Sequence, residues 1–225
     1  METRSIAIDG PAGAGKSTLS KKAAKRFGLI YVDTGALYRC VGLFALRNNV
    51  ASRDKIGVTG LLPDIRVEMK YDSGGTQRML LCSEDVTEAI RLPEASVYAS
   101  DVSAMPAVRE YLLSMQREMA DKYDVIMDGR DIGTVILPNA GLKVFLIADP
   151  EIRAKRRYLE LLGRGIETSF EDVFSDMLSR DKNDSERATA PLKAADDAVL
   201  LDTSRLSFDE SFFALCELIS GRFSQ

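Results

Sequence analysis

The sequence predicts an α/β fold with a parallel sheet core flanked by helices. A short apolar strand containing Ile6 and Ile8 runs into a glycine-rich turn, then a helix, then a second strand over 29–32. Three later apolar segments also read as strands: 125–127, 144–148 and 199–201. Because strand, helix and strand in this order form a parallel βαβ unit, we expect one domain over 1–225.

The first helix is predicted to begin near Lys16. Leu19, Ala23 and Phe27 recur every four residues, which places them on one apolar face. Gly28 follows directly, and glycine is the residue that most often ends a helix in the left-handed conformation. We therefore expect this helix to pack one face on the sheet and to end at Gly28.

An antiparallel insert is predicted at about 60–90. Val67, Met69 and Tyr71 alternate with polar residues before the turn DSGG over 72–75, and the alternation resumes after it. Alternation on both sides of a turn is typical of a β-hairpin.

The later helices carry two kinds of signal. Apolar residues recur at helical spacing after Pro106, and helices are also expected from Pro150 and from near Ser169. Ser207 with Glu210 forms a capping box that predicts the start of the C-terminal helix.

Composition excludes several kinds of chemistry. The 225 residues include no histidine, so histidine general bases, Ser-His-Asp systems and histidine-ligated metals are excluded. Lysine and arginine number 30 against 34 acidic residues, a net charge of -4, so we expect no nucleic-acid partner. Catalysis must therefore depend on carboxylates, lysine, arginine and backbone amides.

The three cysteines and the hydropathy pattern indicate the cellular compartment of the protein. Cys40, Cys82 and Cys216 are widely spaced and odd in number, which favours a reducing compartment over a disulfide framework. No apolar stretch approaches the ~18 residues of a membrane span. We expect a cytoplasmic protein without membrane contact, and a monomer by default.

A phosphate-binding loop is the strongest motif. Residues 10–17 read GPAGAGKS, which matches GxxxxGK followed by Ser or Thr between a predicted strand and a predicted helix. Backbone amides and the helix N-terminus would hold the phosphates of ATP, and Lys16 would add a positive charge. The expected ATP-binding residues are Gly10, Pro11, Ala12, Gly13, Ala14, Gly15, Lys16, Ser17 and Thr18.

Magnesium is the expected cofactor. Ser17 Oγ is the predicted ligand, since magnesium bound to a nucleotide takes few protein oxygens and keeps several waters. Asp128 ends an apolar strand, where its carboxylate would orient the ion directly or through water. A plain turn aspartate is the alternative for Asp128.

Two groups of cations could serve phosphoryl transfer. Arg153, Arg156 and Arg157 are expected on one helix face. Arg180, Asp184 and Arg187 at i, i+4 and i+7 are expected on another. Solvated helix faces with ordinary ion pairs show the same spacing, so periodicity alone leaves both readings open.

The acceptor is the harder question. Asp33 and Asp131 are the candidate bases for a hydroxyl acceptor, but Arg39 and Arg130 nearby suit an anionic one. A small-molecule hydroxyl kinase with Asp33 as base therefore stays open. A GTP-dependent switch is disfavoured because the chain has no NKxD motif.

The ordered motifs resemble those of the bacterial cytidylate kinases along essentially the whole chain. The blocks are IDGPAGAGKST at 8–18, VDTGALYR at 32–39, the hairpin insert, DGRDIGTV at 128–135, RAKRRYLEL at 153–161 and RDKNDSERATAPL at 180–192. The resemblance implies transfer of the γ-phosphoryl group of ATP to CMP or dCMP. It also implies a P-loop kinase with a monophosphate-binding region over 34–105 and a helical lid over 152–188.

The same resemblance implies a role for each polar residue. The cytosine would be met by Thr34, Ser100, Arg109 and Asp131; the acceptor phosphate by Arg39, Arg130 and Arg187; and the sugar by Arg180 and Asp184. Arg153, Arg156 and Arg157 would belong to the lid that closes on ATP. The residues expected to act in catalysis are Lys16, Arg130, Arg153, Arg157 and Arg187.

Overall fold

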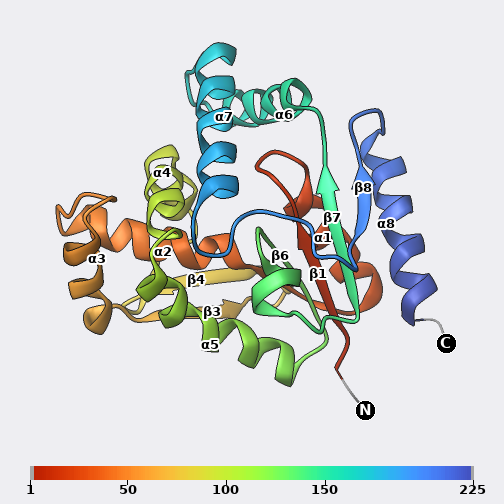
Figure 1. The fold of residues 1–225 in the computed structure, drawn as a ribbon, viewed down its shortest axis with the longest axis horizontal. Helices are drawn as coiled ribbons and strands as arrows, with labels where there is room; N and C mark the ends of the chain where they lie inside the picture. The colour runs from red at the N-terminus through yellow and green to blue at the C-terminus, as the bar shows by residue number, and fades with distance from the viewer. Residues whose placement is uncertain (1–2, 224–225) are drawn as a thin grey trace.

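The computed structural model describes residues 3–223, so the ends of the predicted range 1–225 lie outside it. Its centre is a five-stranded parallel sheet in the order β2-β6-β1-β7-β8 (Figure 1). The strands are β1 Ser5–Asp9, β2 Ile30–Asp33, β6 Val125–Gly129, β7 Leu142–Ile147 and β8 Val199–Asp202. The predicted parallel core is confirmed.

Helices cover both faces of this sheet. They are α1 Lys16–Phe27, α2 Thr34–Arg47, α3 Lys55–Leu61, α4 Pro93–Val102, α5 Pro106–Lys122, α6 Pro150–Gly163, α7 Phe170–Glu186 and α8 Phe208–Phe223. Ile6 and Ile8 pack on the side of α1 and α8, whereas Ala7 faces the cluster that includes Ala120 of α5. The alternation along β1 therefore explains why both faces are apolar.

The predicted insert forms a separate sheet. Strands β3 Val67–Tyr71 and β4 Gln77–Leu81 pair antiparallel, with Met69 opposite Met79, and a short third strand β5 Glu84–Asp85 was not predicted. The buried residues of this sheet join those of α2, α4 and α5 in a second core. Helices α2, α3 and α4 had no sequence prediction.

Local signals placed the helix ends well. Gly28 ends α1 with φ 65°. Ser207 Oγ accepts from the Glu210 amide at 3.2 Å, while Glu210 accepts from the Ser207 amide at 2.8 Å, so the predicted capping box is confirmed. No helix within 3–223 is both long and apolar enough to cross a bilayer.

Candidate active site

The phosphate-binding loop connects the carboxyl end of β1 to the start of α1. Gly10 has φ 146°, and a Cβ there would lie 2.0 Å from the backbone oxygen of Leu146. Only glycine lets the chain pass so close to β7. Gly15, with φ 93°, then turns the chain into α1, whose N-terminal amides face the loop.

Lys16 is buried beneath this loop. Its Nζ donates to the carbonyl oxygen of Pro11 at 2.7 Å, which holds the ammonium group against the loop. Burial, and then the positive charge of Arg130, lower the pKa of Lys16. A phosphate in the loop would oppose both effects by supplying negative charge.

Ser17 and Asp128 come together as predicted. Ser17 Oγ donates to one carboxylate oxygen of Asp128 at 2.6 Å, and Tyr31 Oη donates to the other at 2.9 Å. Burial and the charge of Asp33 raise the pKa of Asp128 against the opposing effect of Lys16. A hydroxyl and a carboxylate beside the phosphate loop are hard oxygen donors that fit magnesium. Tyr31 was missed by the sequence analysis.

A second cluster surrounds Asp131. Its carboxylate forms an ion pair with Arg109 and accepts from Arg187 at 3.4 Å. Arg187 also donates to Ser103 Oγ at 3.1 Å. All three charged side chains are largely withdrawn from solvent.

Arg187 corrects one prediction. It does not share a helical face with Arg180 and Asp184, because α7 ends at Glu186 and Arg187 has the extended angles φ -61° and ψ 137°. The turn after the helix directs Arg187 to Asp131, whereas Asp184 on the helix accepts from Arg130 Nε at 2.7 Å. Arg180 and Asp184 therefore extend from the helix, whereas Arg187 extends from the chain that follows it.

Arg180 is half-buried, and its guanidinium group is incompletely paired. Its Nε has no hydrogen-bond partner in the part of the chain that the structure describes. Burial first, and then the neighbouring charge of Arg130, lower the pKa of Arg180 to about 10. A buried, incompletely paired guanidinium group is costly unless an anion or an acceptor completes it.

The remaining acceptor residues are held in different ways. Thr34 Oγ1 donates to the backbone oxygen of Asp128 at 2.8 Å. Ser100 Oγ is buried and has no partner within 3–223. The Thr34 hydroxyl is therefore paired with the end of β6, whereas the buried Ser100 hydroxyl is unpaired within the described residues.

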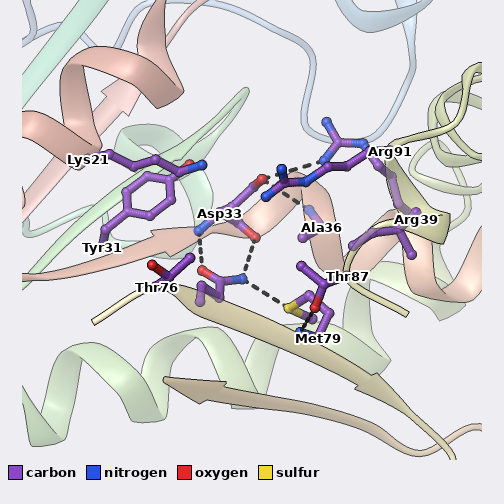
Figure 2. A pocket seen from close by; sticks show the side chains of 11 residues that line it. Lys21, Tyr31, Asp33, Ala36, Arg39, Thr76, Met79, Thr87 and Arg91 are labelled. Atoms are coloured by element: carbon purple, nitrogen blue, oxygen red, sulfur yellow. Dashed lines mark hydrogen bonds and ion pairs between the residues drawn. The ribbon is translucent and has the colours of Figure 1, made fainter. Parts of the chain in front are cut away.

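Asp33 lines a pocket between β2, α2 and the insert (Figure 2). Its carboxylate caps α2 by accepting from Ala36 N at 3.0 Å and lies 3.5 Å from Arg39 Nη1. Lys21, Arg39 and Arg91 give the lining a positive excess. A carboxylate used as a helix cap and ion-pair partner is poorly suited to serve as a general base.

The insert takes part in placing Asp33. Gln77 of β4 accepts from Asp33 N at 2.8 Å, as a neighbouring strand would at this open sheet edge. Tyr71 Oη of β3 donates to Tyr31 O at 3.0 Å. Neither contact was foreseen, since a glutamine or tyrosine in a hairpin carries no local signal of its partner.

The three arginines expected in the lid have separate partners. Arg153 is buried and donates to the backbone oxygen of Ala12 at 3.0 Å and to Asp181 at 2.6 Å. Arg156 donates to the Thr203 carbonyl at 3.0 Å, and Arg157 pairs with Glu160 at 2.8 Å. Arg153 thus ties α6 to the phosphate loop and is no solvated surface cation.

Comparison with known proteins agrees with this geometry. The profile of the cytidylate kinase family matches residues 6–220. A cytidylate kinase from Caldicellulosiruptor bescii is 49% identical over 218 residues, which are 97% of this chain and 96% of that protein. One from Carboxydothermus hydrogenoformans is 47% identical over 217 residues, covering 96% of this chain and 97% of that protein.

Solved structures also resemble the chain. An uncharacterized protein from Eubacterium ventriosum ATCC 27560 has a TM-score of 0.54 at 12% sequence identity, over 98% of this chain and 100% of that one. This likeness concerns the fold alone. From the profile match and the close relatives, the chain belongs to the cytidylate kinase family.

Proposed function

We propose that this chain transfers the γ-phosphoryl group of ATP to CMP or dCMP, giving ADP and CDP or dCDP. One observation carries the proposal: the phosphate loop after β1 and the arginine and carboxylate cluster after β6 lie at the carboxyl ends of adjacent parallel strands. Ligands of open α/β sheets bind at that edge. Membership of the cytidylate kinase family supports the same reaction.

On the donor side, residues Gly10–Thr18 hold the phosphates of ATP. The amides of the loop and of the α1 N-terminus bind the phosphate oxygens, and Lys16 leaves Pro11 to follow the transferred group. Ser17 and Asp128, which contact each other beside the loop, would hold magnesium, Asp128 directly or through water. Magnesium, when bound, neutralises the charge that develops on the phosphates.

On the acceptor side, Asp131 and Arg109 recognise cytosine. The carboxylate accepts from the amino group, and the guanidinium group donates to the ring nitrogen and carbonyl. Uracil presents the reversed pattern and pairs poorly with both. Ser100, whose buried hydroxyl has no partner among residues 3–223, and Thr34 complete the cytosine site.

The acceptor phosphate needs cations and no general base. A phosphate monoester is largely ionised at pH 7 and attacks unaided. Arg39, Arg130 and Arg187 bind it, and each now touches a carboxylate from which the substrate would draw it. Arg180 and Asp184 bind the sugar.

The lid residues act on the ATP side. Arg153, Arg156 and Arg157 lie on α6, and closure of this segment would exclude water from the transferring group. Arg153 holds the loop carbonyl of Ala12, so it is placed to couple the lid to bound phosphates.

Two further predictions concern the setting of the enzyme. Cys40, Cys82 and Cys216 are free, which supports a reducing cytoplasm. A monomer is the default state, and light scattering of the purified chain would measure its mass directly.

The test is an ADP-release assay with one acceptor at a time. We expect rapid turnover with CMP and dCMP, slower turnover with UMP, and none above background with AMP or with sugar and acid hydroxyl compounds. Product analysis should show CDP or dCDP. Turnover only with hydroxyl acceptors would refute the proposal and favour Asp33 as a base.

A further inference from the structure

A buried carboxylate at the end of β1 connects the two halves of the site. We infer that Asp9 is a positioning residue that holds Asp131 in the orientation that selects cytosine. The inference rests on the proposed recognition of cytosine by Asp131. It makes acceptor selection depend on a residue that precedes the phosphate loop and touches neither substrate.

The contacts of Asp9 are specific. It is the last residue of β1, is 4% exposed, and its two carboxylate oxygens accept from consecutive backbone amides. Oδ1 accepts from Ile132 N at 2.8 Å and Oδ2 from Gly133 N at 2.7 Å. Those amides follow directly after Asp131.

The first of these bonds fixes the peptide plane beside Asp131. The amide N–H of Ile132 and the carbonyl of Asp131 belong to one rigid peptide unit. Asp131 has φ -147° and ψ 28°, outside the regular helical and strand regions, and is the residue that precedes the single π-helical turn Ile132–Ile136. The other end of the unit is held because the Asp131 carbonyl accepts from Val135 N at 2.9 Å.

The surroundings leave little room for another arrangement. A Cβ on Gly133 would lie 3.1 Å from Lys143 Cδ and 3.4 Å from Asp9 Oδ2. Burial raises the pKa of Asp9, and the amides of Gly133 and Ile132 lower it; among the neighbouring charges, Asp131 raises it and Lys16 lowers it. Burying one carboxylate beside another lowers the stability of the fold. Its two hydrogen bonds to backbone amides therefore indicate a functional role for Asp9.

The same pair of strands offers a matched control. At the opposite end, Asp124 accepts from the amide of Arg4 at 2.7 Å and from its Nε at 2.8 Å. Asp124 precedes β6 as Asp9 ends β1, and both carboxylates hold the β1 and β6 segments together. Only Asp9 reaches the turn that carries Asp131.

The experiment is a double-mutant cycle read as substrate preference. The ratio of kcat/KM for CMP to that for UMP would be measured for the wild type, Asp9→Ala, Asp131→Ala, the double variant and Asp124→Ala. We expect Asp9→Ala and Asp131→Ala each to lower the ratio roughly 10- to 100-fold. The double variant should fall no further than Asp131→Ala, since one residue acts through the other. Asp124→Ala should keep the wild-type ratio.

Other outcomes separate the two proposals. If Asp131→Ala lowers the preference but Asp9→Ala weakens CMP and UMP equally, or the effects of the two variants multiply, the positioning role of Asp9 is refuted. If the wild type shows no preference, or Asp131→Ala retains it, the cytosine assignment itself fails.

A conservative variant covers the case in which Asp9→Ala does not fold. Asp9→Asn has nearly the same shape and keeps one acceptor oxygen, but turns an N–H group toward the second amide. We expect a smaller fall in the CMP preference, about 3- to 10-fold. Calorimetric titration of CMP and UMP without ATP should show the same loss. An unchanged ratio of the two affinities in folded Asp9→Asn would also overturn the inference.

Discussion

The two sides of this site are built in different ways. The donor side is a contiguous loop, in which the positive φ angles of Gly10 and Gly15 and the start of α1 aim backbone amides at one point. The acceptor side gathers charged side chains from α2, α5, the turn after β6, and α7 with the residue that follows it. The first depends on backbone conformation, the second on tertiary packing.

The two sides also differ in whether their positive groups are paired with carboxylates of the protein. The loop amides need only a phosphate, whereas Arg39, Arg130 and Arg187 of the proposed acceptor side are paired with Asp33, Asp184 and Asp131. Under the proposed function, CMP would replace these carboxylates as the ion-pair partners of the three arginines. A phosphate site made of backbone amides needs no charged partner within the protein. Buried arginine side chains, in contrast, need carboxylate counterions.

The largest effect is expected on the donor side. Lys16→Ala should lower kcat by about 1,000-fold or more, because the mobile charge that stabilises the transferred group is lost. Calorimetry should find CMP affinity nearly unchanged. Lys25→Ala, on an exposed part of the same helix, is the control and should keep full turnover. Near-normal kcat in Lys16→Ala would mean that the loop amides alone suffice.

Buried charge at the junction of the two sides should make stability depend on pH. Burial raises the pKa of Asp9 to about 6, above its unfolded value of 3.8. The folded state therefore binds the proton more tightly, so this contribution to stability is present below pH about 4 and is lost as pH rises through about 6. Its size is on the order of 3 kcal/mol.

Urea unfolding of the wild type and Asp9→Asn at pH 4.5, 5.5 and 7.5 measures this contribution. The free energy of unfolding of Asp9→Asn should improve relative to the wild type as pH rises. A constant difference between the two proteins would show that Asp9 does not titrate in this window, and that its charge is better compensated than the geometry implies.

The helix cap at Ser207 takes no part in the proposed site, so its loss should have only a local effect. Ser207→Ala removes the cap of α8 and should lower the free energy of unfolding by about 1 kcal/mol. Ser185→Ala, on an exposed position within α7, is the control and should change it little. A loss several times larger would show that the Ser207 cap also supports tertiary packing.

The smallest effect should come from Asp33. Asparagine caps helices about as well as aspartate, so Asp33→Asn should keep α2 in place and change kcat with CMP by less than about threefold. A general base would instead be worth about 100-fold or more. Parallel measurement of the melting temperature separates a folding defect from a catalytic one. A hundredfold loss of kcat in folded protein would restore Asp33 as a base.

Local patterns in the sequence were enough for the sheet, the phosphate loop and several helix ends. Three such patterns each involve only a few neighbouring residues: the alternation around Ile6 and Ile8, the glycine spacing at 10–15, and the pair Ser207 and Glu210. They can be recognised without knowing which distant residues they contact. Helices α2 and α4 escaped prediction because most of α2 is buried and α4 has only a weak apolar face.

The acceptor residues were named through family resemblance, and their arrangement needed the tertiary structure. Spacing placed Arg187 on a helical face, yet the helix ends one residue earlier and the following turn sends Arg187 to Asp131. Nothing local connects Asp9 with Ile132, which lies 123 positions along the chain. The sequence by itself determined features whose free energy is local, whereas long-range pairing of buried charges was decided only by the packed fold, because their stability depends on which partners share the same low-dielectric space.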